Sequence, residues 1–246
     1  MKILGLIPSR MESQRLPAKS LLPISGLPLV IHTYRRANLS KLLDKTLICT
    51  DSKKIVQTAK KFKSKAVMTS PYHKNGTERI AEAFIKEKDN FDLVVDIQGD
   101  EPLISPYHID EVIKFHKKNL DADIILPTLR INFPDNPNII KVVTNKKNEV
   151  LYLSRSKIPF EAKSKSSFLK HLSIISFKPD ALIKFAKSKQ TPLEKIEDIE
   201  LLRALEIGLK IKTLKLKGDS FSVDVREDYK RAKDRMNKDK FFKLYK

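Results

Sequence analysis

Short apolar runs alternate with longer polar and amphipathic stretches along the first hundred residues. Four runs predict strands, and helical spacing of the apolar residues between them predicts three helices. The strands are expected at residues 2–7, 46–50, 66–69 and 91–97, and the helices at residues 28–38, 52–62 and 78–88. Such alternation is typical of right-handed βαβ units in a parallel sheet. The first hundred residues therefore predict a Rossmann-like nucleotide-binding half.

The remainder of the chain is less regular. Strands are predicted at residues 124–131, 139–143, 150–154, 171–177 and 211–216, and helices at residues 192–208 and 226–245. Thr191 is a suitable N-cap for the first of these helices, and Gly208 a suitable end. The Ser/Lys stretch at residues 163–167 is expected to be a mobile loop. No linker divides the sequence, so one α/β domain over residues 1–246 is predicted, with a mixed, mostly parallel sheet flanked by helices.

Composition limits the class of protein. Hydrophobic residues make up 41% of the 246 residues, enough for a folded core. With Cys49 as the single cysteine, no internal disulfide can form, which favours a reducing compartment. The apolar run at residues 2–7 is too short for a signal peptide or a membrane span. We expect a cytoplasmic protein with no membrane partner.

The charge is strongly positive, at +19 from 49 Lys and Arg against 30 Asp and Glu. Such a field attracts polyanions. However, only 11 of the basic residues are Arg, and proteins that read bases tend to concentrate Arg and interleave aromatic residues. Lysine spread over the surface is the simpler interpretation, an anionic small substrate is the next, and nucleic-acid binding stays an alternative.

A basic segment follows the first strand. Residues 7–19 read Ile-Pro-Ser-Arg-Met-Glu-Ser-Gln-Arg-Leu-Pro-Ala-Lys. Ligands of open α/β sheets bind at the carboxyl ends of the strands. The segment is not a P-loop, because that motif requires a Gly-rich turn together with its Lys-Ser or Lys-Thr pair, and Gly26 is the only glycine nearby. Arg10, Arg15 and Lys19 are therefore expected to bind phosphate directly, the arginines with bidentate geometry. The alternative is a solvated loop.

Carboxylates follow two further apolar runs. Asp100 comes just after the predicted strand at 91–97, and Asp224 follows an apolar pair near the C-terminus. Mg²⁺ prefers one or two carboxylates together with phosphate oxygens and water, so Asp100 is the first candidate ligand. A turn aspartate that bonds its own backbone is an equal alternative at Asp100. Asp224 alone is a weak signal.

Taken together, these pieces resemble the 3-deoxy-manno-octulosonate cytidylyltransferase (CMP-Kdo synthetase) family. Matching segments lie at residues 7–19, 75–82, 98–102, 136–143, 151–159, 171–172, 192–203 and 223–224, in the family's order. The resemblance implies a nucleotide-diphospho-sugar transferase fold, a homodimer, and a reaction of CTP with the acidic sugar Kdo that gives CMP-Kdo and pyrophosphate for lipopolysaccharide biosynthesis. It also implies that residues 130–190 contain sugar-site and dimerisation parts.

The resemblance assigns roles to particular residues. It implies nucleotide binding by Pro8, Arg10, Ser13, Arg15, Lys19, Gly76, Thr77 and Arg79, and sugar binding by Gln98, Arg155, His171 and Glu200. Mg²⁺ is implied as the cofactor, held by Asp100 and Asp224, and with Lys19 these two are the expected catalytic residues. From the residues alone, Arg155 is equally a surface cation and His171 a structural residue.

The chain also departs from the family pattern. Ser173 and Ile175 stand where the family usually has Gly and Tyr, and Leu201 where it usually has Gln. Losing hydrogen-bond partners can change the preferred substrate by orders of magnitude. A different acidic 2-keto-3-deoxy sugar is therefore an alternative acceptor, and an inactive relative that binds CTP is another. Ala18 replaces a usual Gly, a mild change if the backbone φ there is negative.

Overall fold

The computed structural model describes residues 1–13 and 15–246. Tertiary contacts divide the chain into two compact units: residues 1–110 together with 220–246 form the first unit, and residues 111–219 form the second. The single domain predicted from the sequence stays a prediction. Among the described residues, no helix combines the length and the apolar character needed to cross a bilayer.

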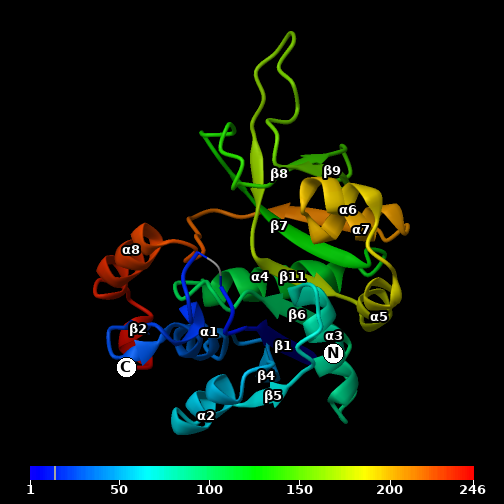
Figure 1. Cartoon of the computed structure of the whole chain (residues 1–246). Helices are drawn as coiled ribbons and strands as arrows, with labels where there is room; N and C mark the ends of the chain where they lie inside the picture. Colours follow the sequence, from blue (N-terminus) through cyan, green and yellow to red (C-terminus); the bar gives the residue numbers. More distant parts are fainter. Residues whose placement is uncertain (14) are drawn as a thin grey trace. The chain divides into compact units, whose positions relative to one another are not determined.

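A four-stranded parallel sheet forms the centre of the first unit (Figure 1). Its strands are β1 (Ile3–Pro8), β4 (Lys45–Thr50), β5 (Ala66–Met68) and β6 (Leu93–Ile97), in the order β5-β4-β1-β6. Every neighbouring pair is parallel. All residues of β1 and β6 are buried, as expected for central strands covered on both faces. The predicted βαβ pattern is confirmed.

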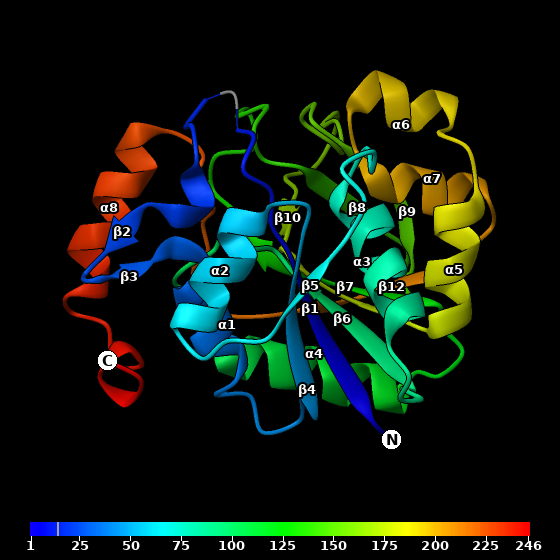
Figure 2. The same cartoon turned by 60° about the horizontal axis from the view of Figure 1, so that its bottom comes forward.

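Three helices connect and cover these strands (Figure 2). They are α1 (Leu29–Ala37), α2 (Lys53–Lys61) and α3 (Gly76–Lys86). Ser52 caps α2 as predicted, because its side chain accepts a hydrogen bond from the Ile55 N–H. Asn75 caps α3 in the same way through the Glu78 N–H, so α3 begins two residues before the predicted start.

The first unit also contains the C-terminal part of the chain. A short hairpin of β2 (Pro23–Ile24) and β3 (Leu27–Pro28) turns at Ser25 and Gly26, whose φ angles of 44° and 91° suit a type I′ turn. Next to it lie α8 (Arg226–Met236) and the 3₁₀ turn η2 (Phe242–Leu244). The prediction of one helix over residues 226–245 is wrong, because Asp239 accepts a hydrogen bond from the Phe242 N–H and starts a separate turn.

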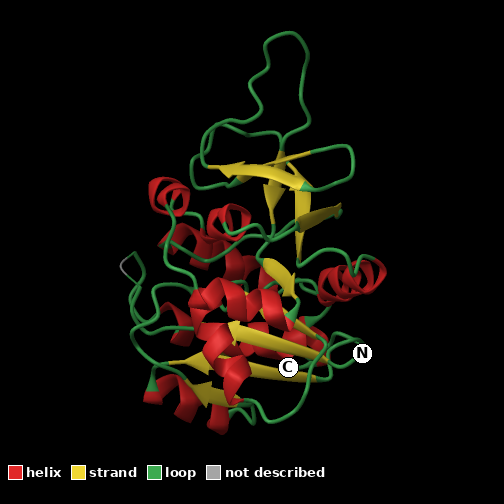
Figure 3. Ribbon diagram, turned by 90° about the vertical axis from the view of Figure 1, so that its right-hand side faces the viewer, coloured by secondary structure: helices red, strands yellow, loops and turns green. Residues whose placement is uncertain are grey.

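A mixed sheet forms the second unit (Figure 3). Its strands are β7 (Ile124–Arg130), β8 (Lys141–Thr144), β9 (Val150–Ser154), β10 (Leu169–His171), β11 (Ile174–Phe177) and β12 (Ile211–Lys215). The strand β7 pairs in parallel with β12 and antiparallel with β10 and β11. Between β9 and β10 the chain forms a long loop with no helix or strand, drawn in green in Figure 3.

The helices of this region differ from the prediction. The predicted helix at 192–208 is two helices, α6 (Pro192–Glu197) and α7 (Glu200–Glu206), because Asp198 adopts a left-handed φ of 52° between them. Thr191 lies at the N-cap of α6 as predicted, where its N–H donates to the Glu194 carboxylate, and the stop at Gly208 is confirmed. The predicted strand at 171–177 is divided between β10 and β11. The helices α4 (Pro106–Lys118) and α5 (Pro179–Lys187) were not predicted, although each begins with proline, a favoured first helical residue.

Candidate active site

Two loops of the first unit approach each other closely at the carboxyl edge of its sheet. A Cβ atom on Gly99 would lie 2.5 Å from the Pro8 carbonyl oxygen, so only glycine allows this approach. The position of Gly76, at the start of α3, is adjacent: its Cβ would lie 3.4 Å from both the Pro8 ring and the Gln98 amide nitrogen. The structure therefore brings together Pro8, Gly76 and Gln98, three of the predicted site residues.

The segment of residues 9–19, here called the basic loop, is held by its own hydroxyl groups. The Ser9 hydroxyl donates to the Ser20 hydroxyl at 2.8 Å, and Ser20 in turn donates to the Arg10 carbonyl at 3.1 Å. The Ser13 hydroxyl accepts a hydrogen bond from the Leu16 N–H at 3.4 Å. Gln14 lies outside the described residues. These bonds give the loop a defined turn, with the Arg10 side chain exposed to solvent.

Ala18 adopts a left-handed conformation within this loop. Its φ is 53° and its ψ 28°. The sequence analysis expected alanine to be a mild replacement for glycine here if φ were negative. Because φ is positive, that expectation is wrong. A Cβ atom is unfavourable in this region of φ/ψ space, because it comes close to the following carbonyl oxygen.

The end of the basic loop meets both predicted metal-ligand aspartates. The Lys19 Nζ atom lies 2.8 Å from an Asp100 carboxylate oxygen and 3.0 Å from an Asp224 oxygen. An Arg15 guanidinium nitrogen lies 3.1 Å from the same Asp224 oxygen. The Lys19 side chain is only 14% exposed, whereas that of Arg15 is 59% exposed. Two cations of the loop and two distant aspartates thus form one cluster, which we call the Lys19 cluster.

The charges of this cluster stabilise one another. Burial acts to lower the pKa of Lys19, but attraction and hydrogen bonds to Asp100 and Asp224 outweigh it and raise the pKa above its usual value. Burial acts to raise the pKa of Asp224, but Lys19, the Ser222 hydroxyl and Arg15 lower it. The ammonium group and the Asp224 carboxylate are therefore both ionised at neutral pH.

Backbone contacts hold the two aspartates together. The Val223 N–H donates to the Asp100 carbonyl at 2.9 Å, which joins the chain segments that carry the two carboxylates. The Ser222 hydroxyl donates to Asp224 at 2.9 Å. Asp228, in the first turn of α8, accepts hydrogen bonds from the N–H groups of Asp224 and Val225. The sequence analysis missed Ser222 and Asp228; the position of Asp228 at the start of a helix was the available signal.

The Lys19 cluster is suited to a divalent cation. Its two carboxylates already contact one common cation, the Lys19 ammonium group, so they are close enough to share another. Among the described residues, no group of three or more His, Cys, Asp or Glu side chains could hold a metal without help. Two carboxylates completed by phosphate oxygens and water are the arrangement that Mg²⁺ usually adopts.

The start of α3 is fixed by two of its own side chains. Arg79 is buried and donates to Asp51 at 2.8 Å and to the Thr69 hydroxyl at 2.7 Å. Glu82 accepts from the Ser70 N–H and contacts the His73 ring. Thr77 is also buried. The observed contacts of Arg79 position the loop before α3. Because its guanidinium group is already bonded to protein groups, direct contact of Arg79 with a nucleotide stays a prediction.

In the second unit, Arg155 is held by the end of α6. Its guanidinium group donates to the Glu197 and Asp198 carbonyl oxygens at 2.8 and 2.9 Å. The Glu197 carboxylate accepts from the Ser154 hydroxyl and the Arg155 N–H. The fully buried Lys141 ammonium group donates to the Arg155 carbonyl, and burial lowers its pKa. The sequence analysis did not select Glu197 or Lys141, whose roles depend on tertiary contacts.

His171 lies on β10 near Arg155. Burial lowers its pKa to about 4, and the positive charge of Arg155 acts in the same direction, so the ring is neutral at pH 7. Its Nδ1 atom is buried, with no hydrogen-bond partner in the described part of the chain. Glu200 is the first residue of α7. Whether His171, Arg155 and Glu200 bind a sugar stays a prediction.

The positions that depart from the family pattern differ in exposure. Ser173 is half-buried between β10 and β11, whereas Ile175 and Leu201 are buried, at 7% and 3% exposure. Arg203, two residues after Leu201, is fully buried and forms an ion pair with Glu194. The Glu194 carboxylate also accepts a hydrogen bond from the Thr191 N–H at the start of α6. The motif over residues 192–203 therefore includes a structural ion pair.

Comparison with known proteins decides the family. A family model described as cytidylyltransferase matches residues 4–211. The chain is 40% identical to 3-deoxy-manno-octulosonate cytidylyltransferase of Thermodesulfovibrio yellowstonii, over 94% of this chain and 97% of that protein. The chain belongs to the 3-deoxy-manno-octulosonate cytidylyltransferase family. It is also 37% identical to 8-amino-3,8-dideoxy-manno-octulosonate cytidylyltransferase of Shewanella frigidimarina, over 96% and 99% of the two chains.

A solved structure supports the same family. CMP:2-keto-3-deoxy-manno-octonic acid synthetase complexed with CTP superposes with a TM-score of 0.92 at 29% identity, covering 97% of this chain and 99% of that one. The predicted family, the Rossmann-like nucleotide-sugar transferase fold and the class of CTP-dependent nucleotidyltransferase are confirmed. Membership of this enzyme family favours the catalytic interpretation over nucleic-acid binding.

Proposed function

We propose that this chain couples CTP to 3-deoxy-manno-octulosonate (Kdo) and releases pyrophosphate. The anomeric hydroxyl oxygen of the sugar attacks the α-phosphorus, and the bond from that phosphorus to the β-phosphate oxygen breaks. The observation that carries the proposal is the Lys19 cluster, in which Lys19, Arg15, Asp100 and Asp224 meet in a member of this family. The product CMP-Kdo would serve lipopolysaccharide biosynthesis.

The basic loop supplies the charge that this reaction needs. Negative charge accumulates on the α-phosphate and on the departing pyrophosphate, and fixed cations that face it stabilise the transition state. Arg10 and Arg15 are exposed enough to reach a triphosphate, while Lys19 is held by carboxylates at the end of the same loop. We assign triphosphate binding to these three residues, with Pro8, Ser13, Gly76, Thr77 and Arg79 shaping the nucleotide site.

Asp100 and Asp224 would hold Mg²⁺. The ion, when bound, neutralises charge on the triphosphate and lowers the pKa of the attacking hydroxyl group. The low pKa of Asp224 keeps its carboxylate ionised and available as a ligand at neutral pH. With the carboxylates holding the metal, the Lys19 ammonium group would be available to phosphate oxygens.

Gln98, Arg155, His171 and Glu200 are assigned to the acidic sugar. Arg155 offers a positive charge for the sugar carboxylate. His171 is neutral at pH 7, so its ring presents one hydrogen-bond donor and one acceptor to hydroxyl groups. These roles rest on the family resemblance and on the chemistry of the four side chains.

The proposal is tested by pyrophosphate release with CTP, Mg²⁺ and Kdo. We expect Asp100→Asn to reduce the rate by at least about 100-fold, because it removes a carboxylate ligand of the Mg²⁺ ion that would face the reacting phosphate. Lys19→Ala should raise the CTP concentration required and lower the rate. Asp234→Asn, the same change at an exposed position of α8, serves as the control and should leave the rate unchanged. Full activity of Asp100→Asn would contradict the proposal.

A different acidic 2-keto-3-deoxy sugar is the second candidate acceptor. Buried aliphatic side chains at Ile175 and Leu201 support it, as does the similarity to a relative named for an 8-amino-3,8-dideoxy sugar. The same assay with Kdo and its 8-amino-8-deoxy analogue distinguishes the two. Turnover of the amino sugar with Kdo left unreacted would identify the amino sugar, and not Kdo, as the substrate. CTP binding without turnover of either sugar would indicate an inactive relative.

We also propose that the protein works as a cytoplasmic homodimer. Large apolar side chains in the region predicted for dimerisation are well exposed, with Phe133 at 79%, Leu151 at 58% and Phe160 at 88%. Exposed apolar residues of this size favour a contact between protein surfaces. Light scattering after size-exclusion chromatography tests the dimer, and Phe160→Glu should shift the protein toward the monomer.

A further inference from the structure

Residues 226–245, which include α8 and η2 and are here called the C-terminal segment, carry none of the predicted site residues. This segment also lies beyond residue 211, where the match to the family model ends. Nevertheless, it contacts the Asp224 backbone and shares an apolar cluster with Leu16, the neighbour of Arg15. It therefore reaches both stretches of chain that form the Lys19 cluster, in which Lys19 and Asp224 are 205 residues apart.

The first contact fixes the backbone of Asp224. One carboxylate oxygen of Asp228 accepts hydrogen bonds from the N–H groups of Asp224 and Val225, at 3.1 and 3.3 Å. Its other oxygen pairs with Arg231 one turn later, at 2.9 Å. The first turn of α8 therefore determines the direction in which the chain carries the Asp224 side chain.

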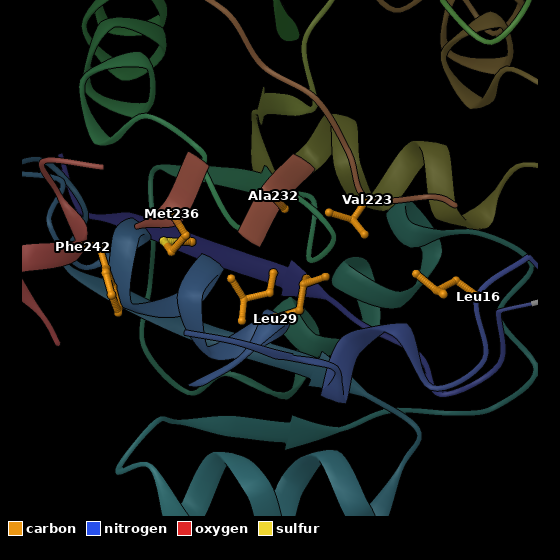
Figure 4. Packing of buried hydrophobic residues seen from close by; sticks show 7 residues of the cluster. Leu16, Leu29, Val223, Ala232, Met236 and Phe242 are labelled. Atoms are coloured by element: carbon orange, nitrogen blue, oxygen red, sulfur yellow. The ribbon is translucent and has the colours of Figure 1, made fainter. Parts of the chain in front are cut away.

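The second contact holds the residues just before Asp224. The Phe221 ring lies under the Arg231 and Arg235 guanidinium groups, at 4.1 and 5.1 Å from the ring centre. Val223 points into an apolar cluster together with Ala232 and Met236 of α8 (Figure 4). Val223 and Met236 are both fully buried. Segment 221–224 is thus held to α8 by the Phe221 and Val223 side chains.

The third contact reaches the basic loop. Leu16, which follows Arg15 directly, belongs to the same apolar cluster as Val223 and is 7% exposed (Figure 4). The cluster also includes Phe242 of η2 and Leu29 of α1. Leu16 and Val223 each neighbour a charged member of the Lys19 cluster, so one apolar cluster fixes both.

The C-terminal segment is itself firmly held. Asp239 pairs with the buried Arg36 at 2.6 Å, and the Tyr245 hydroxyl lies 3.0 Å from the ring nitrogen Nδ1 of the buried His32. The Ser25 hydroxyl donates to Asn237 at 2.8 Å. These partners lie on α1 and on the β2–β3 hairpin, so the C-terminal segment is fixed to the core of the first unit. It therefore holds the residues of the Lys19 cluster that it contacts in a fixed position.

We infer that the C-terminal segment is a positioning element of the metal and triphosphate site, with Asp228 as its principal positioning residue. The inference rests on the proposed function, because it concerns how Asp224 is presented to Mg²⁺ and CTP. Removing a group that orients a metal ligand typically weakens metal binding by 10- to 100-fold. Asp228 should therefore affect Mg²⁺-dependent CTP binding rather than the sugar.

The experiment measures CTP affinity by isothermal titration calorimetry, with Mg²⁺ and with EDTA. In Asp228→Ala, we expect the gain in CTP affinity that Mg²⁺ provides to fall by about tenfold. Asp228→Asn keeps an oxygen that accepts the two N–H groups, so it should retain the gain to within about threefold. The KM for the sugar should stay close to the wild-type value in both variants.

Glu227→Ala is the matched control, since it removes an exposed carboxylate from the same first turn of α8. If Asp228→Ala keeps the full Mg²⁺-dependent gain, as Glu227→Ala should, the inference is overturned while the proposed function stands. If the wild-type protein gains no CTP affinity from Mg²⁺, the proposed function fails and the inference with it. Should Asp228→Ala not fold, Phe221→Leu tests the same element, because it removes the ring that lies under Arg231 and Arg235. We expect the gain in CTP affinity from Mg²⁺ to fall by several-fold in this variant. An unchanged gain would overturn the inference.

Discussion

Gly99 shows how much the site depends on a single missing side chain. The Cβ of an alanine would lie 2.5 Å from the Pro8 carbonyl oxygen, a backbone atom that can move only with β1. We predict that Gly99→Ala lowers the free energy of unfolding by about 1–3 kcal/mol, the usual cost of overpacking, and weakens CTP binding. Urea denaturation and calorimetry measure the two effects.

Gly76→Ala provides the comparison for Gly99. At Gly76 an added Cβ meets no atom closer than 3.4 Å, which is ordinary van der Waals contact. Its free energy of unfolding should stay near the wild-type value. Equal stability of the two variants would show that the Pro8 and Gly99 loops move apart without cost.

Ala18 is a residue at which a substitution should stabilise the protein. Its left-handed backbone costs a residue with a Cβ atom roughly 1–2 kcal/mol, and glycine avoids this cost at the expense of some unfolded-state entropy. We predict that Ala18→Gly raises the free energy of unfolding by about 0.5–1 kcal/mol. Ala59→Gly, inside α2, should instead lower it by about 1 kcal/mol. A destabilised Ala18→Gly protein would contradict this account.

At the scale of elements, α6 and α7 depend on a buried ion pair. Arg203 donates to Glu194 at 2.7 Å, stacks on the Phe185 ring at 4.3 Å, and is fully buried. We predict that Arg203→Ala lowers the free energy of unfolding by about 3–5 kcal/mol, because the Glu194 carboxylate is left buried and unpaired. Thermal and urea unfolding check the prediction.

A double substitution tests the reason. If the loss in Arg203→Ala comes from the unpaired carboxylate, then Arg203→Met combined with Glu194→Leu should recover much of the stability, since a well-packed apolar pair can replace a buried ion pair. Failure of the double variant to recover would instead point to lost packing against Phe185.

At the scale of the whole molecule, buried histidines should make stability depend on pH. Burial lowers the pKa of His116 and of His171 to about 4, and burial also lowers the pKa of His32. An unfolded histidine takes up its proton near pH 6.5, whereas the His116 and His171 rings stay neutral in the folded protein until the pH approaches 4. The unfolded state therefore binds more protons between these values, so stability is full above pH 6.5 and falls as the pH decreases toward 4.

Urea unfolding at pH 7.0, 6.0 and 5.0 measures this dependence. His116, which is fully buried between Ser176 and the Ala122 carbonyl, should contribute up to about 3 kcal/mol across the full window. His116→Gln keeps a donor and an acceptor but cannot titrate, so it should flatten the slope. An unchanged slope in this variant would assign the dependence to other groups.

Much of the first unit follows from local sequence. The strands β1, β4, β5 and β6 are short apolar runs between amphipathic helices, and Ser52 caps α2 as its position predicts. The periodicity of apolar residues is a local property, so it can be read without tertiary contacts. The interruption at Asp198 and the turn after α8 could not be predicted in this way, because neither contains the Gly or Pro that usually signals a break.

The charged residues of the site were also visible in the sequence, since Arg15 and Lys19 lie in the polar segment after β1 and Asp100 lies three residues after β6. Their arrangement in space was not visible in the sequence. Lys19 meets Asp224 across 205 residues, and Glu197 and Lys141 contact Arg155 from 42 and 14 residues away. Chemical identity and periodicity belong to the chain, whereas distance between remote side chains exists only after the core has packed, and that packing decides which carboxylates share a cation.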